Sequence, residues 1–211
     1  RLGEMSLEVE GQAGTFGARN ETPSFGRLVI GDMAWTRLDG FRQALAAIFD
    51  EGHRAEYLDG LTRLEVIGSR GARQPVTSAE LLMAAWIASR AGYSSPAWAQ
   101  GGVSMKLAGS GSRALIGFSG GRSTNGTMPL RGVRMEAHLG RNRLELELMS
   151  VQGEGHLSLR ETGTRTISRT VHMPHPDEAE VLSRELARLG RDRVYEDALM
   201  SAARIQAAQT S

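Results

Sequence analysis

The feature that most constrains this chain is a block of alternating apolar and polar residues between Val103 and His172. The clearest runs are residues 133–139 and 144–148, and the intervening Gly140–Arg143 segment has the composition of a hairpin turn. Alternation with a period of two places successive side chains on opposite faces of a strand. The block therefore predicts an antiparallel sheet with one solvated face and one apolar face that needs cover.

Residues 31–51 (GDMAWTRLDGFRQALAAIFDE) form the first of two segments with helical periodicity before this block. Asp32 stands where a carboxylate can cap the first turn. The apolar stripe that begins at Trp35 is typical of a helix anchored in a core, and a partner-binding face is the alternative. The Asp39-Gly40 pair predicts a kink or break, because glycine inside a helix costs about 1 kcal/mol relative to alanine.

Residues 78–92 (SAELLMAAWIASRAG) form the second helical segment, with Ser78 as the expected cap. This segment is apolar on most of its surface, so we expect it and Trp86 to be deeply buried. A strand is predicted from Thr62 to Gly68, and a loop from Tyr93 to Gly102. The two tryptophan-containing helices are the candidates for covering the sheet.

Helical periodicity returns after Pro176, with Asp177 as the expected cap. Four apolar residues are expected to line one face of this helix: Val181, Leu182, Leu186 and Leu189. Gly190 then breaks the pattern before a last helix. The sequence thus predicts an α+β fold: an antiparallel β-sheet covered by helices, with helices at both ends of the strand block.

The order of these segments also suggests how the chain is divided. We expect residues 31–211 to form a single α+β domain. Residues 1–30 are rich in Gly, Ser, Thr and Asn, so we expect an N-terminal strap or the remnant of a preceding domain. The first residue is Arg1 rather than methionine, so we expect a fragment or a trimmed product.

Composition excludes several classes of function. Among 211 residues, 25 are basic and 24 acidic, so no net field attracts nucleic acid or an anionic membrane. The chain has no cysteine, which excludes disulfides, thiolate metal sites and thiol catalysis. No apolar run reaches the roughly 18–20 residues that span a bilayer, and the first residues lack a secretory layout. We therefore expect a soluble, cytoplasmic protein.

Three segments resemble one known family, the glucose-6-phosphate dehydrogenase assembly proteins (OpcA). Residues 32–51 are similar to its D-L-A-W-T-R-L-T-P-W-R segment. Residues 78–92 resemble its S-A-x-L-L-A-x-W-L-A-S-R-L-G helix, and residues 182–199 (LSRELARLGRDRVYEDAL) resemble its closing L-x-x-E-L-R-R-L-x-x-D-x-V-Y-x-x-A-L. The three occur in the family's order and correspond to the C-terminal half of such a protein.

The resemblance implies a function that composition cannot supply. Family members bind glucose-6-phosphate dehydrogenase, promote its assembly and raise its activity. The implied role is a non-catalytic assembly factor and allosteric activator in the oxidative pentose phosphate pathway, with no enzyme activity and no cofactor of its own. Family members also carry an N-terminal α/β half, and the redox control associated with some of them would have to lie outside this cysteine-free chain.

Exposed aromatic residues and arginines are the residues that tend to dominate interface energies. On that chemistry the candidate interface residues are Trp98, Arg37, Arg42, Arg188 and Arg191. The arginines near the C-terminus alternate with acids, so a solvated face with i,i+4 pairs such as Glu180–Arg184 is the alternative. The partner implied by the resemblance is the dehydrogenase, with no nucleic acid and no membrane.

The glycine-rich run of residues 117–127 is the basis of an alternative function. It could bind a sugar phosphate or nucleotide as a regulatory domain, through Gly120, Gly121, Arg122 and Ser123. The run lacks the Gly-Lys-Ser/Thr of a P-loop and the G-x-G-x-x-G spacing. A flexible hairpin loop is the simpler interpretation.

Two polar clusters could carry metal or acid–base chemistry. His172, His175 and Asp177 are close in sequence, but zinc usually takes three or four well-fixed ligands, so a solvated strand end is favoured. Glu136 and Glu145 lie on the polar side of predicted strands, where cross-strand ion pairs are the ordinary interpretation. These clusters therefore indicate neither a metal site nor an enzyme.

Overall fold

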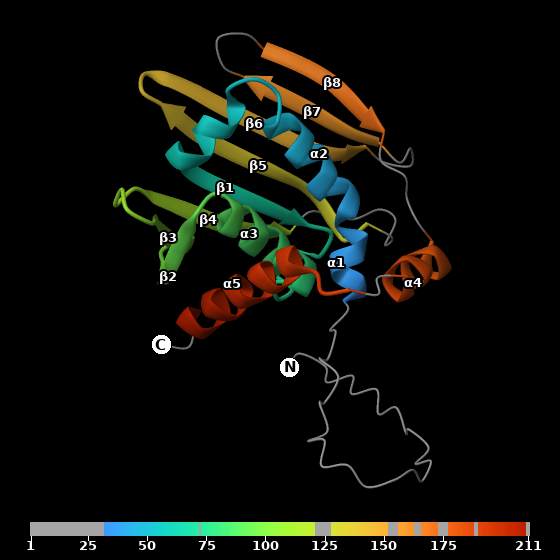
Figure 1. The fold of residues 1–211 in the computed structure, drawn as a ribbon. Helices are drawn as coiled ribbons and strands as arrows, with labels where there is room; N and C mark the ends of the chain where they lie inside the picture. The colour runs from blue at the N-terminus through green and yellow to red at the C-terminus, as the bar shows by residue number, and fades with distance from the viewer. Residues whose placement is uncertain are drawn as a thin grey trace, which may run out of the picture.

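The computed structural model describes residues 32–71, 73–120, 128–151, 156–162, 166–172, 177–187 and 190–209. In this part of the chain one large sheet carries most of the helices on one of its faces (Figure 1). The predicted N-terminal strap, residues 1–30, lies outside the described residues.

The helices are α1 (Met33–Arg37), α2 (Asp39–Phe49), the 3-10 helix η1 (Arg54–Gly60), α3 (Ser78–Arg90), α4 (Glu178–Leu186) and α5 (Arg193–Gln209). The strands are β1 (Leu61–Gly68), β2 (Tyr93–Ala99), β3 (Gly102–Leu107), β4 (Arg113–Gly120), β5 (Leu130–Leu139), β6 (Asn142–Val151), β7 (His156–Thr162) and β8 (Thr166–His172). The predicted strand at Thr62–Gly68 and the hairpin turn between β5 and β6 are confirmed.

The strands form an eight-stranded sheet in the order β2-β3-β4-β1-β5-β6-β7-β8. The α+β class is confirmed, but the prediction of an antiparallel sheet is wrong at one pair, because β1 and β4 run parallel. All other neighbouring strands are antiparallel. The helix α3 and the strands β2 and β3 separate β1 from β4 in sequence, which is the long connection that parallel neighbours require. The sheet is therefore mixed, and α3 interrupts the order of strands.

The prediction of a loop over Tyr93–Gly102 is also wrong, since β2 occupies most of it. The β2–β3 register shifts between Ser94 and Ala97, where Ser95 has a left-handed φ of 54°. A bulge of this kind, followed by Pro96, is tolerated at the edge of a sheet, where one side of the strand needs no backbone partner. The bulge breaks the alternation that would have marked the strand.

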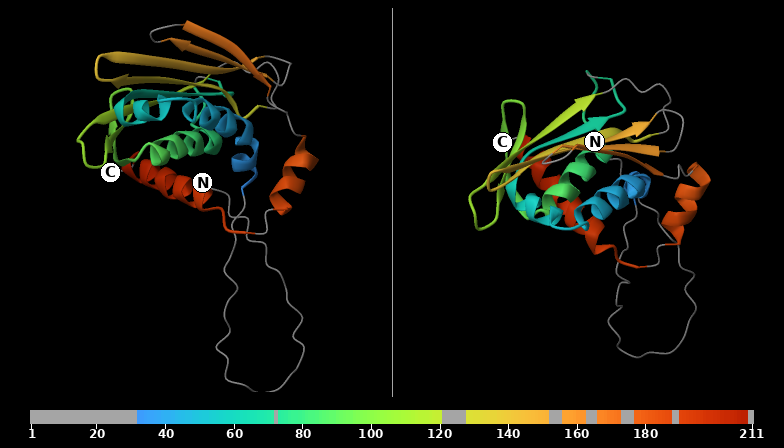
Figure 2. Two further views of the ribbon diagram at one scale, coloured as in Figure 1. Left: turned by 45° about the horizontal axis from the view of Figure 1, so that its top comes forward. Right: turned by 90° about the horizontal axis from the view of Figure 1, so that it is seen from above.

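The helices α2, α3 and α5 cover one face of the sheet (Figure 2). Trp35 and Trp86 are buried, with 1% and 9% of their surface exposed, so the prediction that both lie in the core is confirmed. The predicted break is present at Leu38, which separates α1 from α2 directly before Asp39. Asp32 caps α1 as expected, because its carboxylate accepts a hydrogen bond from the amide of Ala34 at 2.7 Å.

The N-terminus of α3 is capped by Thr77 rather than by Ser78, in a capping box with Glu80. The Glu80 carboxylate is fully buried and accepts hydrogen bonds from Arg70 Nε, which is 2.9 Å from both oxygens. A side chain at Gly68 would meet this carboxylate, because an added Cβ would lie 2.4 Å from Glu80 Cδ. Glycine at the end of β1 thus leaves room for the buried ion pair.

The structure corrects the predicted apolar face of α4. Val181 is buried against the rest of the fold, but Leu182 and Leu186 are 47% and 70% exposed. Leu189 lies outside the described residues. The helix packs against α1 at the side of the domain (Figure 1), so its apolar stripe is not covered by the sheet. Asp177 caps α4 as predicted.

Candidate protein-interaction site

The end of α4 is attached to the start of α1 by polar contacts. The amide of Asp32 donates to Glu185 Oε1 at 2.9 Å, and the hydroxyl of Thr36 donates to the other oxygen of the same carboxylate. Thr36 is buried, so its hydroxyl needs such an acceptor. Glu185 therefore fixes the position of α4, which otherwise buries only the side of Val181.

A second set of contacts joins α1 to α5. The indole of Trp35 donates to Asp192 Oδ2 at 3.0 Å, and the other oxygen of Asp192 accepts the amide of Tyr195 at 3.0 Å. The rings of Trp35 and Tyr195 lie 5.5 Å apart, and the guanidinium of Arg42 is stacked 3.5 Å from the Trp35 ring centroid. The tryptophan is thus enclosed by groups from α2 and from the start of α5.

Tyr195 has the most perturbed hydroxyl of this region. It donates to Asp32 Oδ2 at 3.4 Å, and burial together with the negative charges of Asp32, Glu185 and Asp192 raises its pKa above that of an ordinary tyrosine. A phenol in this position stays protonated and acts as a hydrogen-bond donor. The arrangement supports a structural joint between α1, α4 and α5 rather than a nucleophile or a base.

The residues of this joint come from the first and third segments that carry the family resemblance. Asp32, Trp35 and Thr36 belong to the first, and Asp192 and Tyr195 to the third. Periodicity gave no reason to pair these segments, because it describes each helix separately. The signal that could have linked them is that both match motifs of one family.

Two candidate interface residues lie near this joint. Arg37 is 31% exposed and forms an ion pair with Glu178 of α4. Arg42 is 13% exposed, forms an ion pair with Asp39 and stacks on Trp35. Arg37 therefore keeps part of its side chain exposed to solvent, whereas most of the Arg42 side chain is packed against Trp35 and Asp39.

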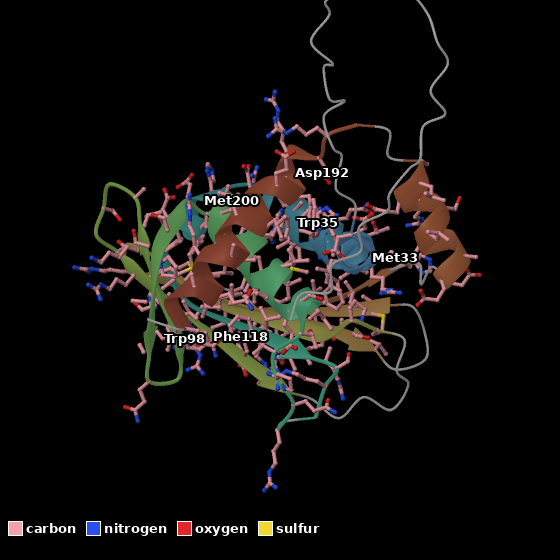
Figure 3. The ribbon with its side chains drawn as sticks, turned by 90° about the horizontal axis from the view of Figure 1, so that it is seen from below. Met33, Trp35, Trp98, Phe118, Asp192 and Met200 are labelled. Atoms are coloured by element: carbon pink, nitrogen blue, oxygen red, sulfur yellow. The ribbon has the colours of Figure 1, made fainter. Side chains whose placement is uncertain are left out.

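Two of the remaining candidates contact opposite ends of α5. Trp98 is 37% exposed and donates its indole hydrogen to the carbonyl oxygen of Ile205 at 3.1 Å, near the C-terminal end of α5. Arg191 is 44% exposed and forms an ion pair with Glu196 at the opposite end of that helix. Arg188 lies outside the described residues. Trp98 is therefore far from the Arg37 region, as Figure 3 shows for Trp98 and Trp35.

The alternative phosphate loop can be followed only at its first residue. Residues 117–120 belong to β4, which corrects the prediction that the loop starts at Gly117. Gly120 is the last residue of that strand, where it pairs with Gly68. Gly121, Arg122 and Ser123 lie outside the described residues.

One serine in the same run has the spacing of a hydrolase motif, since residues 117–121 read G-F-S-G-G. A nucleophile elbow places its serine on a sharp turn between a strand and a helix. Ser119 instead lies within β4, where it pairs with Ile67 of β1. Its hydroxyl donates to Glu65 Oε1 at 2.8 Å, so the serine contributes to the polar sheet surface rather than to a catalytic triad.

The carboxylates of the uncovered sheet face are paired with arginines. Arg134 contacts Glu147 at 2.8 Å and Glu65 at 3.7 Å. Arg143 contacts Glu136 at 3.2 Å and Glu145 at 2.7 Å, so the predicted cross-strand ion pairs are confirmed. Between these strands a shallow hollow of about 410 Å³ is lined mainly by the same charged side chains. Carboxylates held in this way are suited to surface electrostatics rather than to acid–base catalysis.

Residues 32–209, with the gaps given above, contain no group of three His, Asp or Glu side chains that could hold a metal ion. His172 is exposed at the end of β8, His175 lies outside the described residues, and Asp177 accepts the amide of Glu180 at 2.8 Å as the α4 cap. The helices in the same ranges lack the combination of length and apolar composition that a bilayer span requires.

The most apolar exposed feature of this region is the outer side of α4. Leu182 and Leu186 are one helical turn apart, and both are more exposed than Trp98. They lie on the helix that Arg37 contacts through Glu178. Adjacent leucines with an arginine at the rim are typical of a helix that binds a protein partner.

Comparison with known proteins identifies one family. Residues 29–199 match the OpcA family model for the C-terminal domain of a glucose-6-phosphate dehydrogenase subunit. No curated protein matches the chain. Two crystal structures of super-repressor mutants of Gal80p from Saccharomyces cerevisiae, Gal80(S2) and Gal80(S0), have TM-scores of 0.46 and 0.43 at 14% and 12% identity. The alignments cover 88% of this chain and 64% and 63% of those chains, so the chain spans less than two thirds of their length.

Proposed function

Because this chain belongs to the OpcA family, as the C-terminal domain of a glucose-6-phosphate dehydrogenase subunit, we propose that it is a non-catalytic partner of glucose-6-phosphate dehydrogenase. In this role it binds the enzyme, promotes its assembly and raises its activity in the oxidative pentose phosphate pathway of the cytoplasm. The observation that carries the proposal is the extent of the family match, which runs from residue 29 to residue 199 and includes all three segments discussed above.

The α4 edge is the surface we assign to the dehydrogenase. It combines the exposed Leu182 and Leu186 with the partly exposed Arg37. Complete burial of a fully exposed leucine side chain gains roughly 1.5–3 kcal/mol. Leu182 and Leu186 are 47% and 70% exposed, so a partner that covers both gains about as much as from one such leucine. The polar attachment of α4 through Glu185 holds these leucines in place before the partner arrives, which reduces the entropy cost of binding.

Activation without chemistry requires a difference in affinity between states of the enzyme. A partner raises activity when it binds the active conformation or oligomer more tightly than the inactive one. An almost complete switch between two states requires a difference of about 5.5 kcal/mol. Burying the two α4 leucines supplies part of this difference if the contact exists in only one state of the enzyme, and the rest comes from the wider interface.

The proposal is tested by measuring binding of the purified full chain to glucose-6-phosphate dehydrogenase. The double variant Leu182→Asp/Leu186→Asp should weaken binding at least about 30-fold, because two charges replace the apolar contacts. The matched control is Met200→Asp, which changes another apolar side chain, 58% exposed, on α5. This control should change the affinity less than about 3-fold.

Circular dichroism of each variant should match the wild-type chain, since all three side chains are exposed. Equal binding by the double variant and the wild type would place the dehydrogenase elsewhere on the surface. Absence of binding by the wild-type chain itself would contradict the proposed function.

A further inference from the structure

The sheet face opposite the helices has no cover from the described residues (Figure 2). A row of four charged residues crosses this face, one on each of the neighbouring strands β1, β5, β6 and β7: Glu65, Arg134, Glu147 and Arg160. Each is the direct cross-strand partner of the next. Their exposed fractions show that they point away from the core. The charges along the row are negative, positive, negative and positive.

This order has a geometric consequence. Consider a line that runs between β5 and β6 parallel to the strands: residues at equal distances on its two sides carry charges of opposite sign. A second copy rotated by 180° about such a line in the plane of the face would place its Glu147 opposite Arg134 and its Arg160 opposite Glu65. We propose that the uncovered sheet face binds a second copy of this chain in a two-fold dimer, through this row of alternating charges.

The residues at the two ends of the row, Glu65 and Arg160, also favour a second copy of this chain as the partner. Arg134 is already shared between Glu65 and Glu147 within one copy, whereas Arg160 has no ion pair with any described residue. The second copy supplies a carboxylate to Arg160 and a second guanidinium to Glu65. Sheets that pack face to face are about 10 Å apart, a gap that arginine and glutamate side chains span from both sides.

The adjoining row contains Glu136 and Glu145, which the same rotation brings opposite each other. In each copy Arg143 contacts both of these carboxylates, so two guanidiniums accompany the four acids. The outer strands β4 and β8 carry no charge at the level of the charged row, where they have Gly117 and Ser168, and the rotation also brings these two residues opposite each other. No pair of unscreened like charges arises along the charged row.

The size of the face is sufficient for a stable dimer. The rotation superposes six strands, β4-β1-β5-β6-β7-β8, with the axis at their centre. At about 4.8 Å per strand and about 25 Å of strand length, the shared face covers on the order of 700 Å² per copy. A standard protein interface covers roughly 800 Å² per partner.

A pair of charge reversals tests the proposal on the full chain alone. Arg160→Glu places two carboxylates opposite each other at both ends of the interface, and Glu65→Arg does the same with two guanidiniums. Each variant should raise the dimer dissociation constant at least about 100-fold, because opposed like charges are strongly unfavourable at an interface. An equimolar mixture of the two variants should dimerise again, since the opposed charges then differ in sign.

The measurement is sedimentation velocity over a range of concentrations, with Arg204→Glu as the control. Arg204 is exposed on α5, on the covered side of the sheet, so its reversal should leave the dimer unchanged. A wild-type chain that remains monomeric overturns the proposal, as does a dimer that survives Arg160→Glu. A monomeric wild-type chain whose binding to the dehydrogenase is lost in Arg160→Glu would assign this face to the dehydrogenase instead. None of these results depends on whether the α4 edge binds the enzyme.

Discussion

The covered and the uncovered faces of the sheet are made by the same strands but are stabilised in different ways. In β1 the consecutive residues Arg63, Leu64 and Glu65 alternate between the two faces, and Leu64 is completely buried while Arg63 is exposed. On the covered side, stability comes from apolar packing around Trp35 and its neighbours. On the uncovered side, arginines and glutamates interact in pairs that solvent screens.

The difference shows where sequence change is tolerated. A side chain on the covered face has no alternative environment, because close-packed neighbours fit its volume. On the uncovered face, water can hydrate a charged side chain whose ion-pair partner has been removed, so losing such a partner costs little folding free energy. The need to fold therefore limits which residues can occupy the covered face. The uncovered face and the α4 edge can instead carry residues that serve binding to another protein.

The largest difference in unfolding free energy should appear between a variant that breaks a buried ion pair and one that breaks an exposed ion pair. Glu80→Ala removes the fully buried carboxylate from Arg70, which is 7% exposed, and should cost about 3–5 kcal/mol of unfolding free energy. Glu136→Ala removes an exposed partner of Arg143, which keeps Glu145, and should cost less than about 1 kcal/mol. Urea denaturation measures both values. Equal costs would show that the two faces do not differ in this way.

A smaller but still clear difference in stability is expected when two adjacent residues of β1 are each replaced by alanine. Leu64→Ala should destabilise the protein by about 3 kcal/mol, because it leaves a cavity at a site with 0% exposure. Arg63→Ala, one position earlier on the other face, should change stability by less than about 0.5 kcal/mol. Thermal unfolding of both variants checks the comparison. A cost above about 2 kcal/mol for the arginine variant would contradict it.

The smallest effect concerns the joint between the helices. Tyr195→Phe removes the hydrogen bond to Asp32 and should cost about 1 kcal/mol or less at neutral pH. The pKa of Tyr195 is raised in the folded state above its ordinary value of 10.0, so its stabilising contribution is present below that pH and is lost as the pH rises further. The variant should therefore lose less stability than the wild type in alkaline solution. Parallel alkaline unfolding curves would rule out this role of the hydroxyl.

Several parts of the fold followed from local patterns in the sequence. The positions of Trp35 and Trp86 in the core, the break before Asp39 and the β5–β6 hairpin all depend on periodicity or on a single residue type, and the structure has each of them. The parallel pairing of β1 with β4 could not be predicted, because alternation fixes which face a side chain occupies but not which strand lies alongside. β2 was missed because Ser95 and Pro96 form a bulged edge.

The candidate site was less predictable than the fold. Periodicity identified the stripe that contains Leu182 and Leu186 but could not show that the domain leaves it uncovered. Arg42 was selected for its chemistry, yet it stacks on Trp35 across the helix break, a contact that depends on tertiary structure. Helical periodicity and residue type indicate an amphipathic helix or a binding-prone side chain, whereas exposure depends on how distant segments pack.

We propose that this chain acts on glucose-6-phosphate dehydrogenase by binding and not by chemistry of its own. The most direct measurement is dehydrogenase activity at varied glucose-6-phosphate while the purified wild-type chain is titrated in. We expect activity to rise and saturate with added chain, and the chain alone to turn over no substrate. An activity that stays constant at every concentration of the chain would contradict the account.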